Sequence, residues 1–254
     1  MLLAIDAGNT NIVFAVFDGE SQKCIWRIHT DRARTADEYT SIVSGLYREA
    51  GLSCEAIKDV IISSVVPSAN PHLAAFCKAK HNIEPRFINA EDLQGRVHIN
   101  LEQPDKVGAD RIVNAVAVCK FYQTPAVVVD FGTATTFDVI NEDNVYEGGI
   151  IAPGINLSSE ALHKAAAQLP MVGITKTETV IGKNTAHAME SGIYWGYVGL
   201  IEGMLKRIES ELGIKPFVIG TGGLAPLFSE GTDVLSVIDQ ELTVKGLLEI
   251  YKNE

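Results

Sequence analysis

The chain has 254 residues, enough for one large domain or two of ordinary size. Hydrophobic residues make up 46% and charged residues 21%, so the chain can bury a full core, and its composition is neither disordered nor fibrous. Its 21 Lys and Arg against 32 Asp and Glu give a net charge of −11 without a basic cluster, which argues against a nucleic-acid partner.

Other classes are also disfavoured by the sequence. No stretch approaches about 18 uninterrupted apolar residues, so we expect no membrane partner and no membrane span. The first residues lack a basic segment and a small-residue cleavage site, so no signal peptide is expected. The four cysteines are separated by 30, 23 and 42 positions, which matches no zinc pattern and favours reduced thiols in a cytoplasmic protein.

Hydrophobic periodicity predicts an alternation of strands and helices. In chain order, the first half contains expected strands at 2–5, 12–17 and 24–30, a helix at 37–50, a strand at 59–65, and helices at 71–80 and 107–121. The second half contains expected strands at 126–129, 134–140 and 145–151, a long helix at 184–211, a strand at 217–220 and a final helix at 242–251. A similar element order occurs twice, which predicts an α/β protein.

A D-x-G turn between two strands opens each half. Residues 6–10 read DAGNT and residues 130–134 read DFGTA, and the two aspartates are 124 positions apart in a chain whose half-length is 127. This spacing indicates an internal repeat. We therefore expect two homologous domains, residues 1–117 and 118–254, facing each other across a cleft.

The chemistry of these turns suits phosphate groups. Glycine lets backbone N–H groups approach an anion closely, and a carboxylate at a strand end can hold a hydrated Mg²⁺ or another cation, or orient water. For a single turn, Asp6 or Asp130 more often accepts only turn hydrogen bonds. The pair of turns favours phosphate binding. Further donors are the hydroxyls of Thr10, Thr133, Thr135 and Thr136.

A second motif, GADR at 108–111, opens the helix expected at 107–121. Asp110 is a candidate general base, and Arg111 can hold a carboxylate or phosphate through two parallel hydrogen bonds. The alternative is an ordinary first-turn aspartate beside a surface arginine.

The long helix at 184–211 carries two further features. Asn184 or Thr185 suits its N-cap, and the Thr185 hydroxyl can also bind a polar substrate group. Four glycines at steps of 4, 3 and 4 share one face, which favours either close packing within the chain or a dimer seam. They are Gly192, Gly196, Gly199 and Gly203.

Taken together, these motifs resemble those of the type III pantothenate kinases, in the superfamily of acetate and sugar kinases, heat-shock chaperones and actin. The matching segments are spread over the whole chain in the family's order, at 6–11, 104–114, 130–136, 148–154, 181–192 and 220–223. One position departs from the pattern, since Leu101 stands where many members carry an aromatic residue before the G-x-D-R motif.

The resemblance implies two duplicated ribonuclease-H-like domains, each with a mixed β-sheet flanked by helices. It implies that they bind ATP and transfer its phosphate to the terminal hydroxyl of pantothenate, the first step towards coenzyme A. It implies a cytoplasmic homodimer, Mg²⁺, and a monovalent cation, K⁺ or NH₄⁺. It implies Asp110 as the catalytic base and Asp6 and Asp130 as metal ligands. Pantothenate would contact Gly108, Ala109, Asp110, Arg111 and Thr185. ATP would contact Thr133 and the first loop, which is Asp6, Ala7, Gly8, Asn9, Thr10, Asn11, Ile12 and Val13.

Three alternatives stay open from the sequence. The first is a kinase of the same fold that acts on a sugar or a short carboxylic acid. The second is a non-catalytic regulator that has kept the fold, although both D-x-G carboxylates and Asp110 are present. The third is a hydrolase of nucleotides or polyphosphate, because a base at Asp110 can also activate water.

Overall fold

The computed structural model describes residues 1–89, 96–166 and 169–252, and the chain divides into two compact units. The first unit comprises residues 1–98, 102–121 and 242–254, and the second comprises residues 99–101 and 122–241. The last helix of the chain therefore belongs to the first unit. The expected boundary between residues 117 and 118 separates two homologous halves of the sequence rather than two compact units. It stays a prediction.

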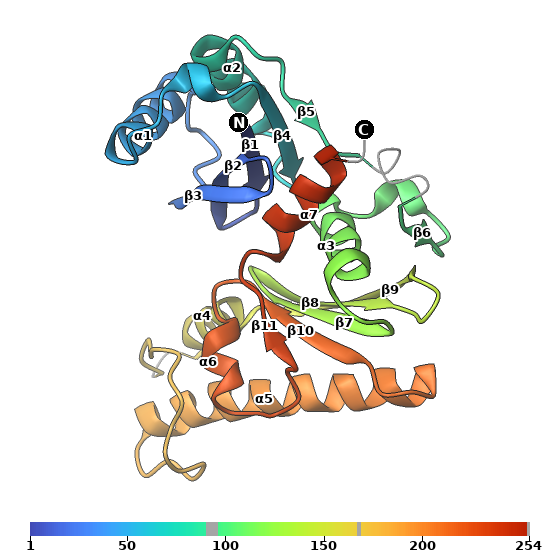
Figure 1. Ribbon diagram of the computed structural model, residues 1–254. Coiled ribbons are helices and arrows are strands. Elements are labelled where there is room, and N and C mark those ends of the chain that lie inside the picture. The colour runs from blue at the N-terminus through green and yellow to red at the C-terminus, as the bar shows by residue number, and fades with distance from the viewer. Residues whose placement is uncertain (90–95, 167–168, 253–254) are drawn as a thin grey trace. The chain divides into compact units, whose positions relative to one another are not determined.

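The first unit is built on a five-stranded sheet with the order β3-β2-β1-β4-β5 (Figure 1). Its strands are β1 (Leu2–Ala7), β2 (Asn11–Asp18), β3 (Ser21–His29), β4 (Asp59–Ser64) and β5 (Arg86–Phe87). Its helices are α1 (Ala36–Glu49), α2 (Asn70–His81), α3 (Ala109–Phe121) and α7 (Leu242–Lys252), with short 3₁₀ helices at Cys54–Ala56 and Pro104–Lys106.

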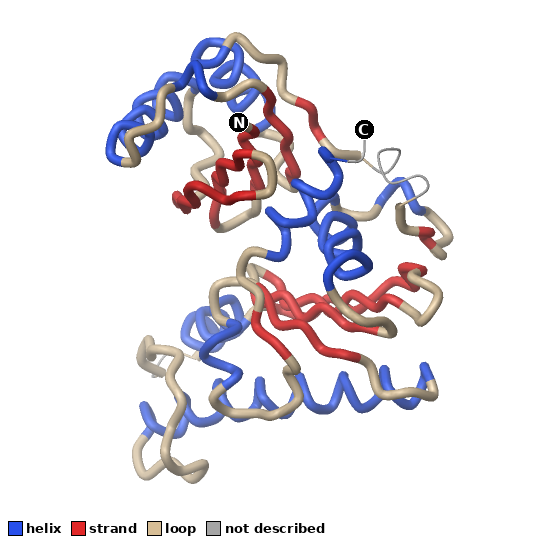
Figure 2. Tube along the Cα trace, viewed as in Figure 1, coloured by secondary structure: helices blue, strands red, loops and turns tan. Residues whose placement is uncertain are grey.

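The second unit is built on a six-stranded sheet with the order β11-β10-β7-β8-β9-β6. Its strands are β6 (His98–Ile99), β7 (Ala126–Phe131), β8 (Ala134–Ile140), β9 (Val145–Pro153), β10 (Phe217–Thr221) and β11 (Val237–Ile238). Its helices are α4 (Ile155–Ala165), α5 (Thr185–Leu212) and α6 (Ala225–Ser229), and α5 runs along one face of the sheet (Figure 2).

The two sheets repeat one topology. In each, three antiparallel strands are followed by two parallel ones, β3-β2-β1-β4-β5 in the first unit and β9-β8-β7-β10-β11 in the second. The predicted α/β class with duplicated ribonuclease-H-like domains and mixed sheets flanked by helices is confirmed. Within the described residues, no helix is both long and apolar enough to cross a membrane.

The core of the first unit follows the alternation of its strands. Leu3, Ile5 and Ala7 point to the face covered by α1 and α2, where they join Tyr39 and Phe76 in one buried cluster. The other face of β1 and β4 is in contact with α3 and α7. Apolar burial on both faces stabilises this sheet and fixes the strand register.

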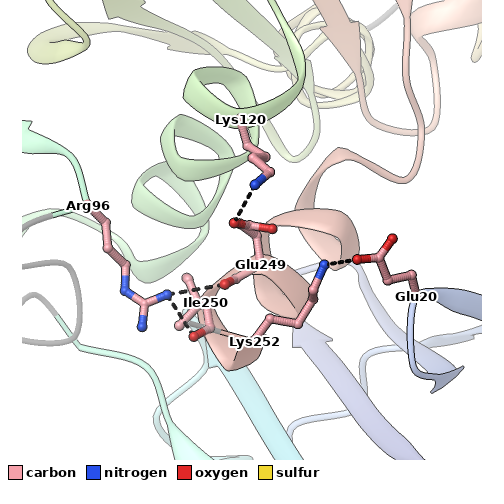
Figure 3. Close-up of polar contacts among 6 residues, drawn as sticks. All are labelled: Glu20, Arg96, Lys120, Glu249, Ile250 and Lys252. Atoms are coloured by element: carbon pink, nitrogen blue, oxygen red, sulfur yellow. Dashed lines mark hydrogen bonds and ion pairs between the residues drawn. The ribbon is translucent and has the colours of Figure 1, made fainter. Parts of the chain in front are cut away.

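The terminal helix α7 is held in the first unit by polar contacts (Figure 3). Arg96 donates hydrogen bonds to the carbonyl oxygens of Glu249 (3.2 Å) and Ile250 (2.7 Å), which satisfies acceptors at the helix end. The buried Glu249 carboxylate forms an ion pair with Lys120 of α3 at 3.2 Å, and Lys252 pairs with Glu20 at the edge of the sheet. These contacts join segments from the two ends of the chain.

Helices α3 and α7 approach each other closely at Gly246. A Cβ atom at this position would overlap the carbonyl oxygen of Val113 and would lie 2.7 Å from its Cγ1 atom. We therefore expect Gly246→Ala to lower the free energy of unfolding by about 1–3 kcal/mol, the usual effect of overpacking, in a urea denaturation experiment.

Gly45 in α1 provides the matched control for this change. A Cβ atom at Gly45 meets no atom within 4 Å, so the same substitution should raise helix propensity and stabilise the protein by about 0.5–1 kcal/mol. Equal effects at the two glycines would contradict the close α3–α7 packing.

Candidate active site

The first D-x-G turn joins β1 to β2 and exposes its backbone. The N–H of Gly8 donates to the carbonyl of Asn11 at 3.0 Å, and the Thr30 hydroxyl donates to the carbonyl of Gly8 at 2.6 Å. Asn9, Thr10 and Asn11 are exposed, as an anion-binding turn requires. Thr30, whose hydroxyl ties the turn to the end of β3, was not identified from the sequence.

Some residues of the predicted ATP loop cannot contact a ligand through their side chains. Ala7 and Ile12 are fully buried in the core of the first unit, so only their backbone groups can serve a ligand. Asp6 and Val13 are partly buried and pair across β1 and β2.

The GADR motif forms the start of α3. The carbonyl of Gly108 accepts the N–H groups of Arg111 and Ile112, and Asp110 accepts the Arg111 N–H on its Oδ1 atom at 2.8 Å. Glycine at 108 leaves room for this carboxylate, because a Cβ atom would lie 2.6 Å from the same oxygen and would displace it. The motif therefore fixes the Asp110 carboxylate against the backbone rather than leaving it at the surface.

The environment of Asp110 suits a proton acceptor. Burial raises the pKa of its carboxyl above the ordinary value, while the Arg111 N–H and the Arg111 guanidinium lower it in part. A carboxylate in such surroundings binds a proton more readily than an exposed one. This geometry is unlike the alternative of a solvated first-turn aspartate.

Within the first unit, the first D-x-G turn and the GADR motif both lie next to Val65. The Val65 N–H donates to the carbonyl of Ala7 at 3.0 Å, and its Cγ1 atom lies 3.6 Å from the position of a Cβ on Gly108. The end of β1 and the start of α3 thus meet at the same edge of the sheet.

The second D-x-G turn joins β7 to β8, with the N–H of Gly132 donating to the carbonyl of Ala134 at 3.1 Å. Gly132 and Thr133 are exposed. Gly222, whose φ is +85°, lies beside this turn, and a Cβ there would be 2.5 Å from Oδ1 of Asp130. A Cβ at Gly154 would overlap the carbonyl of Thr133. Two glycines from distant segments thus allow the chain to close around the turn.

Two of the threonine hydroxyls expected to donate to phosphate near the second turn make contacts within the fold instead. Thr135 is buried and accepts a hydrogen bond from the Tyr197 hydroxyl at 2.8 Å, and Thr136 donates to Asp138 at 3.1 Å. These two threonines were expected to be possible phosphate donors, but their contacts within the fold correct that expectation. Of the three hydroxyls expected to serve phosphate at the second turn, that of the exposed Thr133 is the one that fits.

Thr185 is the first residue of α5 and is exposed. The N-cap is its neighbour Asn184, whose side chain accepts the His187 N–H at 2.9 Å, so the Thr185 hydroxyl is not needed for capping. Thr185 lines a mainly apolar hollow of about 550 Å³ with residues of α4 and α5, among them Ser158, Met189 and Tyr197.

The glycine face of α5 is open. A Cβ atom at Gly192, Gly196 or Gly199 would meet no atom within 4 Å among the described residues, and one at Gly203 would touch only Arg207 of the same helix. As far as the described residues go, the prediction that these glycines pack closely against another helix of the same chain is therefore wrong.

The resemblance implies cations bound by the carboxylates of Asp6 and Asp130. Among the described residues, no three His, Cys, Asp or Glu side chains gather into a metal site. Mg²⁺ in phosphate-transferring sites is usually held by one or two carboxylates together with substrate phosphates. A single strand-end carboxylate such as Asp6 fits that mode.

The sequence of this chain also matches known proteins. A family model described as type III pantothenate kinase matches residues 2–207, a range that includes both D-x-G turns, the GADR motif and Thr185. The chain belongs to the type III pantothenate kinase family. Proteins named type III pantothenate kinase are 53% identical over 252 residues in Paramagnetospirillum magneticum, covering 99% of this chain and 97% of the relative, and 47% identical in Brevibacillus brevis, covering 99% and 98%.

Solved structures resemble the chain in fold alone. A candidate Baf family transcriptional activator from Campylobacter jejuni has a TM-score of 0.62 at 21% identity, covering 99% of this chain and 98% of that one. A candidate 2-dehydro-3-deoxygalactonokinase from Sinorhizobium meliloti has a TM-score of 0.59 at 13% identity, covering 100% and 96%. The kinase family thus rests on the sequence matches, and the architecture is shared more widely.

Proposed function

We propose that this protein transfers the γ-phosphate of ATP to the terminal hydroxyl of pantothenate, the first step towards coenzyme A. The observation that carries the proposal is the family match over residues 2–207, which contains every residue proposed below to contact a substrate or a cation. Relatives about half identical over nearly the whole chain carry the name of this activity.

Asp110 is the proposed base. It accepts the proton of the attacking hydroxyl as the new O–P bond forms and the bond to the ADP oxygen breaks. Its raised pKa and its fixed position at the start of α3 support this role. Gly108, Ala109, Arg111 and Thr185 would contact pantothenate, with Arg111 as a partner for its carboxylate.

The two turns have separate proposed roles towards ATP. The loop 6–13 and Thr133 would hold phosphate oxygens through backbone N–H and hydroxyl groups. Asp6 would bind Mg²⁺, which neutralises developing charge on the phosphates, and Asp130 would bind K⁺ or NH₄⁺.

We also propose a cytoplasmic homodimer. The open glycine face of α5 supports it, because glycines let two helix backbones approach closely and the described residues of this chain leave that face uncovered.

A coupled assay of the purified protein tests the function. ATP consumption should require added pantothenate, with phosphopantothenate identified by mass spectrometry, and hexoses or acetate should not replace it. Turnover of ATP without pantothenate would indicate a hydrolase instead, and no turnover with any acceptor would indicate a regulatory protein.

A further inference from the structure

Ser63, near the end of β4, is a buried polar residue that none of the roles above explains. Its side chain is fully buried, and its hydroxyl oxygen has no hydrogen-bond partner within the described part of the chain. Burying a hydroxyl without a partner disfavours folding, so a serine at this position indicates a function beyond packing.

The strand register places Ser63 directly beside Asp6. Strands β1 and β4 are parallel, and Asp6 is paired with Ser63. Their neighbours Ile5 and Ile62 point into the cluster under α1 and α2, so Asp6 and Ser63 share the opposite face. Parallel strands lie about 4.8 Å apart, so two short polar side chains paired on the same face can come within hydrogen-bond distance of each other.

The second unit repeats this arrangement. Its motif aspartate, Asp130, is paired with Thr221 on the parallel strand β10, and Thr221 is also buried, at 4% exposure. In both halves of the chain, therefore, a hydroxyl residue on the neighbouring parallel strand lies next to the D-x-G carboxylate. The recurrence on two independent strands supports a role connected with the carboxylate.

We propose that Ser63 is a positioning residue for Asp6: when the Mg²⁺–nucleotide complex binds, the Ser63 hydroxyl, which has no partner among the described residues, turns to donate a hydrogen bond to one Asp6 carboxylate oxygen and keeps the other directed towards the complex. The inference rests on the proposed function, because it assumes that Asp6 serves the metal. Ser63 itself touches neither substrate nor cation.

Calorimetric titration of Mg·ADP into four proteins tests the proposal without using turnover: wild type, Ser63→Ala, Asp6→Asn and the double variant. Ser63→Ala should bind about tenfold more weakly, as expected for a lost hydrogen bond to a charged group. The double variant should bind no more weakly than Asp6→Asn, because Ser63 acts through Asp6. Wild-type affinity of Ser63→Ala, or effects that multiply in the double variant, would overturn the proposal.

Ser64→Ala is the matched control. The Ser64 hydroxyl donates to Asn70 at 2.5 Å and accepts the Val66 N–H at 3.2 Å, so its loss should lower the melting temperature and leave Mg·ADP affinity unchanged. Ser63→Ala should show the opposite, with an unchanged or raised melting temperature. If Asp6→Asn binds Mg·ADP with wild-type affinity, the proposed role of Asp6 fails. If Ser63→Ala is the only variant with wild-type affinity, the inference about Ser63 alone fails.

Discussion

Asp110→Asn is expected to lose about 10²–10⁴-fold in kcat, the usual contribution of a general base, while the protein becomes more resistant to heat. Burial raises the pKa of Asp110 in the folded state, so at neutral pH folding must bury an unfavourable charge. The amide keeps the size of the side chain and its acceptor for the Arg111 N–H but removes that charge. Steady-state kinetics and a thermal melt of the same preparation measure both effects.

The pH dependence follows from the direction of the shift. Because the folded pKa lies above the ordinary value of 3.8, the contribution of Asp110 to stability is fully present below that value and is lost as pH rises through the folded pKa. The stability gain of Asp110→Asn should therefore shrink towards acid. The kcat of the wild type should fall towards acid as the base is protonated. Near-normal turnover of Asp110→Asn would remove Asp110 from the base role.

Gly222→Ala is expected to have the second largest effect. The residue has a φ of +85°, which disfavours any side chain, and the new Cβ would lie 2.5 Å from Oδ1 of Asp130 and 2.8 Å from backbone atoms of Phe131. The Asp130 turn must move to accommodate it, and a displacement of about 1 Å in a catalytic site can cost about 10²-fold in rate. We expect a loss of that order in kcat/KM and a weaker response to added K⁺.

The adjacent Gly223 supplies the control for this substitution. It has no positive φ, and a Cβ there meets no atom within 4 Å. Gly223→Ala should therefore retain the melting temperature and the K⁺ response of the wild type. Similar damage from both substitutions would show that any change in this loop, rather than contact with Asp130, is responsible.

Sequence patterns predicted the parts of the fold that follow from local chemistry. The apolar runs of β1, β2, β7 and β8 and the helical spacing of α1 and α5 are visible in the chain itself. The repeat of the D-x-G turn predicted the repeated sheet topology. Helix α4 was not predicted, and its N-cap, Gly154, makes no side-chain hydrogen bond that a capping residue in the sequence would have indicated.

The contacts that complete the site were less accessible to prediction, because they join segments far apart in the sequence. Gly154 and Gly222 approach the second turn from different loops, and Ser63 reaches Asp6 only through the pairing of β4 with β1. No spacing rule indicates these neighbours. The GADR motif indicated Asp110 as a candidate base, but the burial of the Asp110 carboxyl depends on how α3 packs.

The placement of α7 in the first unit has a consequence for biosynthesis. Ala4 and Ile61 lie on the sheet face that α7 helps to cover, and they are made long before residues 242–252 leave the ribosome. The first unit is thus completed only after the whole second unit has been translated. Until then, the apolar sheet face that α7 helps to cover stays exposed in the nascent chain. Synthesis that stops shortly before α7 would therefore yield a chain whose N-terminal part is unfinished, even though all five strands of the first unit are present.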